Sequence, residues 1–282
     1  MIETDVQVGG GRTLHVYDTG EDPDHPLTVL WHHGTPNIGV PPLPLFSASD
    51  RLGIRWVSYD RPGYGGSSPA PGRTVASAAA SAIAVTDALG IERFAVMGHS
   101  GGSPHAMACA ALLPDRVFAV VAISGLAPYG AEGLDWYAGM AAGGVASLSA
   151  AAEGRQAKER YEASESDLDF GFVPADEAAL LGEWSWFLDV VRPALAAGPG
   201  PLIDDDLAYV SAWGFDPAAV RASILLVHGE DDRVVPSTHS AWLAVRCRTS
   251  ELWLRPGEGH VSVMSAGEAA LAWLMTPGRT SL

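Results

Sequence analysis

The chain has 282 residues, with 33 acidic and 17 basic side chains and a formal net charge of −16. Hydrophobic residues make up 48% and charged residues 18%, a balance typical of globular rather than disordered proteins. The negative charge argues against nucleic acid and anionic membranes as partners, because both carry phosphates. A chain of this length can fold as one α/β unit and bury a large core without a metal or a disulfide.

The beginning of the chain and its cysteine content bear on its compartment. The sequence starts with an acidic segment, residues 1–5, which is unlike the basic and apolar start of a signal peptide. Two cysteines, Cys109 and Cys247, are too few for a disulfide scaffold. No run approaches the roughly 18 consecutive apolar residues of a membrane span. We therefore expect a cytoplasmic protein, and the sequence leaves monomer and homodimer both open.

Strand-like and helix-like segments alternate through the first 126 residues. The predicted strands are residues 6–8 and 14–17, which form an opening hairpin, and residues 27–31, 54–59, 94–97 and 117–123. The predicted helices are residues 41–52, 75–89 and 101–113. Because the later strands are nearly continuous in apolar residues, they indicate a mostly parallel sheet covered by helices on both faces.

The alternation stops between about residues 127 and 220 and then resumes. Strands are predicted at residues 224–227 and 251–254, and helices at residues 237–245 and 261–275. The interrupted stretch has no clear strand signal and contains a helix-like run at residues 153–165. We interpret residues 127–213 as a helical cap inserted into a core made of residues 1–126 and 214–282.

The segment Gly98-His99-Ser100-Gly101-Gly102 fits the G-x-S-x-G pattern of a nucleophilic serine. It follows a predicted strand and opens a predicted helix, which is the required context. A sharp strand-to-helix turn brings backbone segments close together, so neighbours without a Cβ are needed. The sequence therefore predicts Ser100 as a nucleophile at the positive end of a helix.

A serine hydroxyl is a weak nucleophile and needs a base and an orienting acid. His260 follows the predicted strand 251–254 and so belongs to the carboxyl end of the sheet, where ligands bind in open α/β folds. Asp232 follows the strand 224–227 and precedes His260 by 28 residues. We favour Asp232 over its neighbours Asp231 and Glu230, which we expect to be solvated.

The same pattern predicts two backbone donors for a tetrahedral oxyanion. One is the N–H of Gly101, directly after the nucleophile. The other should come from the loop after strand 27–31, where His33-Gly34-Thr35-Pro36 offers the N–H of Thr35 and Pro36 has none. We expect His33 to have a structural role beneath this loop.

Together these motifs resemble the α/β-hydrolase fold family, and in particular its cap-bearing serine hydrolases. The matching segments are residues 33–36, 60–67, 98–102, 228–236 and 259–260, in the family's order, and the resemblance spans about residues 12 to 275. It implies an eight-stranded, mostly parallel sheet, a Ser-His-Asp triad, and no cofactor or metal. Within residues 60–67, Arg61 is expected to tie loops together. Serine at the nucleophile position argues against haloalkane dehalogenases and epoxide hydrolases, whose pattern has aspartate there.

The inserted segment is rich in aromatic and acidic side chains. Its aromatic residues predict a partly apolar pocket, and the candidates for substrate contact are Trp136, Trp184, Trp186 and Phe187. Packing within a small helical cap is the alternative role for each of them. We interpret Glu183 and the run Asp204–Asp206 as a solvated acidic face, although such a face could also bind a substrate amine.

These features lead to one main hypothesis and two alternatives. The main hypothesis is an α/β-fold hydrolase that cleaves a small or medium carboxylic ester, thioester or lactone through an acyl-enzyme. A second enzymatic reading is an aminopeptidase similar to proline iminopeptidases, although their H-G-G-P-G and G-G-S-W-G motifs are not reproduced. The third is a ligand receptor or natural-product cyclase that keeps the fold without hydrolysing its ligand.

Overall fold

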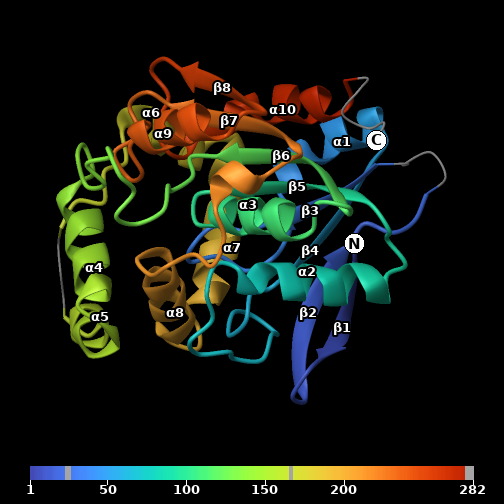
Figure 1. Ribbon diagram of the computed structural model, residues 1–282, viewed down its shortest axis with the longest axis horizontal. Coiled ribbons are helices and arrows are strands. Elements are labelled where there is room, and N and C mark those ends of the chain that lie inside the picture. Colours follow the sequence, from blue (N-terminus) through green and yellow to red (C-terminus); the bar gives the residue numbers. More distant parts are fainter. Residues whose placement is uncertain (23–26, 165–167, 277–282) are drawn as a thin grey trace.

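The computed structural model describes residues 1–22, 27–164 and 168–276. Eight strands form one sheet in the order β1-β2-β4-β3-β5-β6-β7-β8 (Figure 1). They are β1 Ile2–Val8, β2 Arg12–Asp18, β3 Leu27–His32, β4 Ile54–Tyr59, β5 Phe94–His99, β6 Val117–Ile123, β7 Ser223–Gly229 and β8 Ser250–Arg255. The opening hairpin is antiparallel, β2 is antiparallel to β4, and the remaining pairs are parallel. The prediction of a mostly parallel eight-stranded sheet is confirmed.

The helices that alternate with these strands also lie where the sequence predicts them. They are α1 Phe46–Leu52, α2 Ser77–Ala88, α3 Gly102–Leu112, α9 Thr238–Arg246 and α10 Gly267–Leu274. Two predicted helices differ at their start, because 3₁₀ helices at Leu43–Leu45 and Ser262–Ala266 precede α1 and α10. Prolines at positions 41, 42 and 44 lack the backbone N–H that an α-helix would use, which accounts for the later start of α1.

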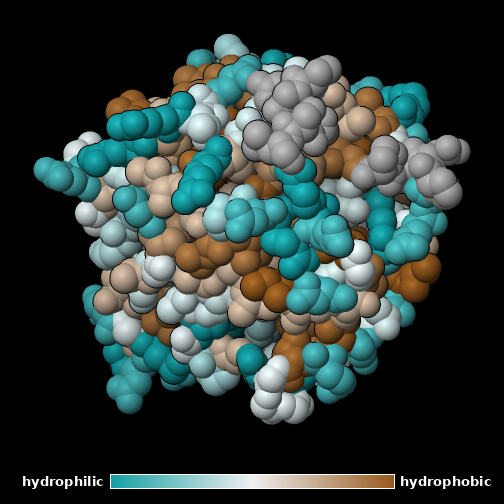
Figure 2. All heavy atoms as spheres, turned by 45° about the vertical axis from the view of Figure 1, so that its right-hand side comes forward, coloured by the Kyte–Doolittle hydropathy of each residue, from teal (hydrophilic) through white to brown (hydrophobic). Residues whose placement is uncertain are grey.

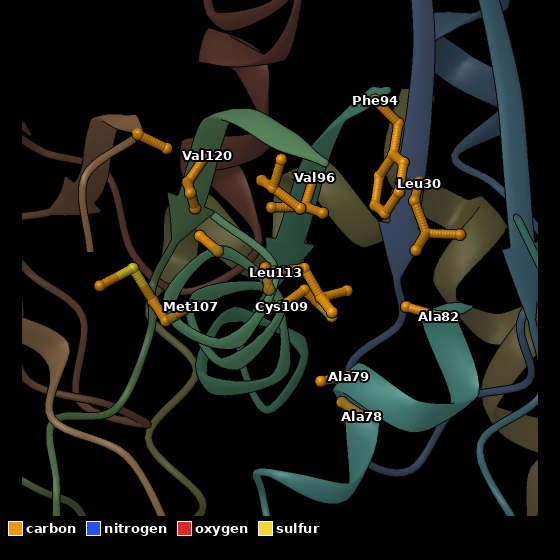
Figure 3. Packing of buried hydrophobic residues seen from close by; sticks show 14 of the residues in the cluster. Leu30, Ala78, Ala79, Ala82, Phe94, Val96, Met107, Cys109, Leu113 and Val120 are labelled. Atoms are coloured by element: carbon orange, nitrogen blue, oxygen red, sulfur yellow. The ribbon is translucent and has the colours of Figure 1, made fainter. Parts of the chain in front are cut away.

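Two buried clusters lie on opposite faces of the sheet. One packs α2 and α3 against the sheet, and Figure 3 shows part of this cluster, with Met107 and Cys109 on α3 and Val96 on β5. The other packs α1 and α10 against the opposite face. Figure 1 shows these two helix pairs on opposite sides of the sheet. Strands enclosed in this way bury both faces, which explains their continuous apolar sequence.

The stretch between β6 and β7 is helical in the part that the structure describes. It contains α4 Ala142–Ala152, α5 Arg155–Glu162, α6 Pro174–Leu181, α7 Trp186–Ala194 and α8 Gly200–Tyr209, with 3₁₀ helices at Glu183–Ser185 and Pro217–Ala219. Helix α5 lies within the predicted run 153–165, of which residue 165 is outside the described residues. No helix was predicted for α4, whose sequence is rich in alanine and glycine. Helices α4, α5 and α8 pack together at one side of the sheet (Figure 1).

The order of strands creates a crevice above the middle of the sheet. Strand β3 lies between β4 and β5, so the chain leaves β3 in one direction and leaves β5 in the other. The loops after these two strands therefore diverge, and ligands of open α/β folds bind at such a point. The predicted segments around Thr35 and Ser100 follow β3 and β5. Topology thus places them on either side of this crevice.

The surface, the helix lengths and the two cysteines complete the description of the fold. Hydrophilic and hydrophobic residues are mixed over the face that Figure 2 brings forward. Among the described residues, no helix is both long enough and apolar enough to cross a membrane. Cys109 and Cys247 are both buried and free.

Candidate active site

The turn between β5 and α3 has the backbone strain that the motif predicts. Ser100 has a φ of 54°, in the left-handed region that residues with a side chain rarely adopt. Its N–H donates to the carbonyl oxygen of Ile123 at 2.8 Å. A Cβ on Gly98 would lie 2.5 Å from the carbonyl carbon of Gly102, and a Cβ on Gly102 would overlap the carbonyl oxygen of His32. Glycine is therefore required on both sides of Ser100 by backbone packing.

His260 and Asp232 form a buried pair at the ends of β8 and β7. The imidazole Nδ1 lies 2.8 Å from Oδ2 of Asp232, and the aspartate side chain is fully buried. The other carboxylate oxygen accepts the N–H groups of Val234 and Val235, each at 2.9 Å. Two backbone N–H groups thus fix the Asp232 carboxylate beside the imidazole, whereas Asp231 and Glu230 are exposed to solvent.

Each member of the His260–Asp232 pair shifts the pKa of the other. Burial alone would raise the pKa of Asp232, but the His260 charge and hydrogen bonds from His228 and His260 hold it well below its usual value. Burial alone would lower the pKa of His260, but the charge and hydrogen bond of Asp232 outweigh it and raise that pKa above 6.5. Asp232 therefore stays ionised and favours a proton on the Nδ1 side of the ring.

Two further histidines, His228 and His99, contact the pair, and the sequence did not predict a role for either of them at the site. His228 Nε2 lies 3.3 Å from Oδ2 of Asp232 and 2.8 Å from the carbonyl oxygen of Val235. His99 Nε2 donates to the carbonyl oxygen of His260 at 2.9 Å. Burial, followed by the charge of His260, lowers the pKa of His99 to about 3, so this ring is neutral. Both side chains hold the His260–Asp232 pair in position.

The first turn of helix α6 clamps the backbone around His260. Asp176, near the start of α6, is fully buried, and its carboxylate accepts the N–H groups of His260 at 3.1 Å, Val261 at 2.7 Å and Ser262 at 2.8 Å. The pattern Val173-Pro174-Ala175-Asp176 could have predicted a helix start, because the same carboxylate accepts the N–H of Val173 at 3.2 Å. Its contact with residues more than 80 positions away had no local signal.

Thr35 is held by a second residue of the insertion. Its hydroxyl donates to Oδ2 of Asp205 at 2.7 Å and accepts from Arg61 at 2.8 Å. The hydroxyl of Tyr209, also on α8, lies 2.8 Å from Thr35 Oγ1 and donates to the carbonyl oxygen of Gly101 at 3.0 Å. Helix α8 thus contacts both residues that the sequence predicts as oxyanion donors.

Arg61 ties the loops together, as the sequence analysis expected. Its guanidinium donates to the carbonyl oxygens of His33 and Gly34 and pairs with Asp205, whose nearest oxygen is 2.7 Å away. His33 is fully buried, donates from Nδ1 to the Gly34 oxygen at 2.8 Å, and accepts the Arg61 N–H at Nε2. Burial and the Arg61 charge lower the pKa of His33 well below its usual value. The neutral ring is therefore a structural support beneath the loop.

The acidic run Asp204–Asp206 is not the solvated face that the sequence suggested. All three side chains are buried, and each is paired with a cation. Asp204 pairs with Arg73 and Arg155, Asp205 with Arg61 and Arg73, and Asp206 with Lys158. Burial alone would raise the pKa of Asp205, but Arg61 and Arg73 hold it well below its usual value. The expectation was wrong because the cations that neutralise this run come from distant parts of the chain. Glu183 is exposed.

The predicted residues converge on one cavity of about 410 Å³. Ser100, His260, Thr35 and Gly101 line it, whereas Asp232 lies behind His260. Most of the remaining lining is apolar: Pro36, Leu126, Leu148, Phe170, Phe172, Leu180, Phe187, Leu188, Val191, Leu202, Val234, Val235 and Val261. The arrangement offers a serine, a polarised imidazole and an apolar binding space in one place.

Of the four aromatic residues that the sequence suggested for substrate contact, the structure places one at the cavity. Phe187 lines the cavity, but the lining does not include Trp136, Trp184 or Trp186. Trp184 and Trp186 pack in the buried cluster that also holds α1 and α10. Trp136 is buried elsewhere, and its indole N–H donates to the carbonyl oxygen of Ala127 at 2.9 Å. These three side chains therefore pack within the protein.

In the described part of the chain, no group of three or more His, Cys, Asp or Glu side chains is placed so that it could hold a metal ion.

Comparisons with known proteins agree with this fold. The family model described as "alpha/beta hydrolase fold" matches residues 28–266. A thermophilic esterase from Thermogutta terrifontis is 19% identical, over 98% of this chain and 97% of its own, with a TM-score of 0.68. An enol-lactonase from Burkholderia xenovorans LB400 is 18% identical, over 97% and 98%, with a TM-score of 0.69. A bromoperoxidase from Bacillus anthracis is 20% identical, over 97% and 99%, with a TM-score of 0.70. At such low identities these structures share the fold alone.

The His260–Asp232 pair predicts a specific change in histidine titration. In Asp232→Asn the carboxylate charge is removed while the burial of His260 remains, so the pKa of His260 should fall by about 1–3 units. Histidine ¹⁵N chemical shifts followed through a pH titration measure this directly. The matched change Asp231→Asn alters an exposed carboxylate and should leave the titration unchanged. An equal shift in both variants, or none in Asp232→Asn, would refute the electrostatic account.

The clamp around His260 predicts a loss of stability when its carboxylate is removed. Asp176→Ala leaves three buried backbone N–H groups without their acceptor, and we expect unfolding in urea to become easier by about 2–4 kcal/mol. Amide hydrogen exchange at residues 260–262 should accelerate as well. The neighbouring exposed change Glu177→Ala should alter stability by less than about 0.5 kcal/mol. Unchanged exchange at residues 260–262 in Asp176→Ala would contradict the clamp.

Proposed function

Since the chain belongs to the α/β-hydrolase fold family, we propose that it is a serine hydrolase acting on a small or medium carboxylic ester, thioester or lactone. The observation that carries this proposal is the 2.8 Å contact between His260 Nδ1 and Asp232 Oδ2, with His260 and Ser100 lining one cavity. A polarised imidazole and a strained serine that line the same cavity are the groups that activate a hydroxyl for acyl transfer.

In the proposed reaction, His260 takes the proton of Ser100 as the hydroxyl oxygen attacks the substrate carbonyl carbon. Asp232 stabilises the imidazolium that forms and keeps the ring in the required tautomer. The N–H groups of Thr35 and Gly101 stabilise the negative oxygen of the tetrahedral intermediate. His260 then protonates the leaving alcohol or thiol, and the acyl group remains on Ser100. Water, activated by the same imidazole, releases the acid and restores the serine.

We assign the cap to residues 127–213 and the catalytic core to residues 1–126 and 214–282. This insertion supplies Phe170 from the segment before α6, Phe187 from α7 and other apolar side chains to the cavity. An apolar lining of this kind suits an acyl chain or an apolar alcohol more than a charged substrate. This supports an ester, thioester or lactone of modest size.

The aminopeptidase alternative is weakened by the charges around the cavity. Capture of a substrate ammonium requires a carboxylate with charge to spare. Asp204 and Asp205 each pair with two arginines, and Asp206 pairs with Lys158. Glu183 is exposed and absent from the cavity lining. The non-hydrolytic alternative has no specific observation in its favour, and the pairing of His260 with Asp232 in the cavity that Ser100 lines supports hydrolysis instead.

Substitution of the proposed triad should remove ester hydrolysis without unfolding the protein. We expect Ser100→Ala and His260→Ala to lower kcat/KM for p-nitrophenyl butyrate by about 10⁴-fold or more. Asp232→Asn should lose about 10³- to 10⁴-fold, because it favours the wrong imidazole tautomer. Circular dichroism should report native folds for all three.

Asp231→Asn is the matched control and should retain nearly full activity. Equal losses in the two aspartate variants would show that Asp232 has no special role. Rapid cleavage of proline p-nitroanilide with no cleavage of p-nitrophenyl butyrate would favour the aminopeptidase, and cleavage of neither substrate class would favour the non-hydrolytic reading.

The pH dependence of hydrolysis should report the state of His260. The base must be neutral to accept a proton, and its pKa is raised above 6.5 because Asp232 outweighs burial. We therefore expect kcat/KM to fall as the pH drops, with a midpoint above pH 6.5 in the free enzyme. An acid limb centred well below pH 6 would contradict a base paired with an ionised aspartate.

A further inference from the structure

One part of the apolar cavity is polar and does not belong to the proposed catalytic machinery. Ser147 of α4 and Asp206 of α8 both line the cavity, and both are more than nine-tenths buried as residues. The other polar side chains of the lining are Thr35 and Asn37 after β3, His99 and Ser100 at the β5–α3 turn, Tyr209 and His260. Ser147 and Asp206 are therefore a separate polar site within the insertion.

A buried lysine accounts for part of this site. Lys158 of α5 has no exposed surface, and its ammonium contacts Glu162 at 2.6 Å, Asp206 Oδ2 at 2.7 Å and Ser147 Oγ at 2.5 Å. An ammonium has three N–H donors, and three acceptors already lie within 2.7 Å of this one. A substrate carboxylate in the cavity would have to displace one of them to reach Lys158.

The acceptor capacity of Asp206 is only partly used. Ser147 accepts from Lys158 and donates its own proton to Oδ2 of Asp206 at 3.3 Å. The hydrogen bond from Ser147 and the ion pair with Lys158 thus both end on Oδ2 of Asp206, and no hydrogen bond from a described residue reaches Oδ1. An ionised carboxylate has about four acceptor positions. The site can therefore accept a hydrogen bond from a ligand but has none to give.

Charge balance selects the kind of donor that would fit. Asp206 is already paired with Lys158, and the surrounding cavity wall is apolar. A substrate ammonium would lose its hydration in this apolar space and would lie close to a second cation, which is unfavourable. A hydroxyl group is neutral and can donate one hydrogen bond at a much smaller desolvation cost. A neutral donor is the best match.

The position of the site limits where the hydroxyl lies in the substrate. Asp206 and Tyr209 are three residues apart on α8, so their side chains are neighbours on one face of the helix. The hydroxyl of Tyr209 donates to the carbonyl oxygen of Gly101, next to Ser100. By contrast, Phe170, Phe172 and Leu188 are about half exposed and border the open part of the cavity. The polar site therefore belongs to the buried part of the cavity, one helical turn from the tyrosine that contacts the residue after Ser100.

We propose that Asp206 and Ser147 form a subsite for a hydroxyl group that the substrate carries a few carbon atoms from its scissile carbonyl. This inference rests on the proposed ester hydrolysis and narrows its substrate class to hydroxylated esters or lactones. A site built to bond a substrate hydroxyl discriminates strongly against the analogue that lacks it, because its own acceptor is then left without a partner.

The test compares matched esters with and without the hydroxyl. The acyl arm uses p-nitrophenyl hexanoate and p-nitrophenyl 6-hydroxyhexanoate, with 5-hydroxyhexanoate to vary the position. The alcohol arm uses hexyl butyrate and the monobutyrate of 1,6-hexanediol, followed by acid release. We expect the wild-type protein to favour the hydroxylated member of one arm by about tenfold or more in kcat/KM. That arm identifies which half of the substrate enters the subsite.

Two substitutions separate direct contact from support of the cap. Asp206→Ala removes the acceptor, and the preference for the hydroxylated ester should fall to about one. Asp206→Asn keeps the size of the side chain and weakens the acceptor, so it should give an intermediate preference even if the alanine variant folds poorly. The matched control Glu162→Ala removes another carboxylate from the same lysine without touching the cavity, and it should keep the full preference.

Each outcome bears on a different claim. Equal rates for hydroxylated and plain esters in both arms would overturn the subsite while leaving ester hydrolysis intact. A preference lost equally in Glu162→Ala and Asp206→Ala would overturn it as well, because the carboxylates would then act only by holding the helices together. Failure of the wild-type protein to cleave any of these esters would overturn the proposed function, and the subsite with it.

Discussion

The backbone at Ser100 has a φ of 54°, and the segments packed around it leave little room for any other arrangement. Gly98 contacts the start of α3, and Gly102 contacts the carbonyl oxygen of His32 at the end of β3. This close approach of β3, β5 and α3 brings the serine and the loop containing Thr35 to the two sides of one crevice. The proposed roles of His260 and Asp232 depend on the position of that turn, because it carries Ser100. The strained backbone at Ser100 is maintained by the packing of the sheet beneath it, because all residues of β3 and β5 are buried.

The insertion contributes to the site through polar contacts as well as through apolar walls. On one side, Asp176 accepts three backbone N–H groups from the segment that carries His260. On the other, Asp205 and Tyr209 hold Thr35 and the turn after Ser100. Buried carboxylates of this kind are costly unless they are fully paired, and here arginines or backbone N–H groups pair them. Hydrogen bonds therefore link the insertion both to the segment that carries His260 and to the two proposed oxyanion residues.

The parts of this architecture that local sequence determines could be predicted. Continuous apolar runs located the central strands, and the glycines around Ser100 located the turn, because a local steric requirement dictates both. His260 and Asp232 followed from their place after parallel strands. The roles of Asp176 and Asp205 could not be predicted, since their partners lie 84 to 170 residues away in the sequence. The same reason explains the acidic run, which the sequence suggested to be solvated because its arginine and lysine partners lie elsewhere in the chain. The packing of Trp184 and Trp186 in the core could not be predicted either, because an aromatic sequence pattern does not indicate which side chains face the cavity.

The central claim is that Ser100 is a nucleophile activated by His260. Intact-mass and peptide mass spectrometry after treatment with a fluorophosphonate test it most directly, because the reagent modifies an activated serine without needing the true substrate. The account predicts a single phosphonate adduct on the peptide that contains Ser100, and much slower labelling in His260→Ala. An unmodified folded protein, or an adduct on another residue with Ser100 untouched, would contradict it.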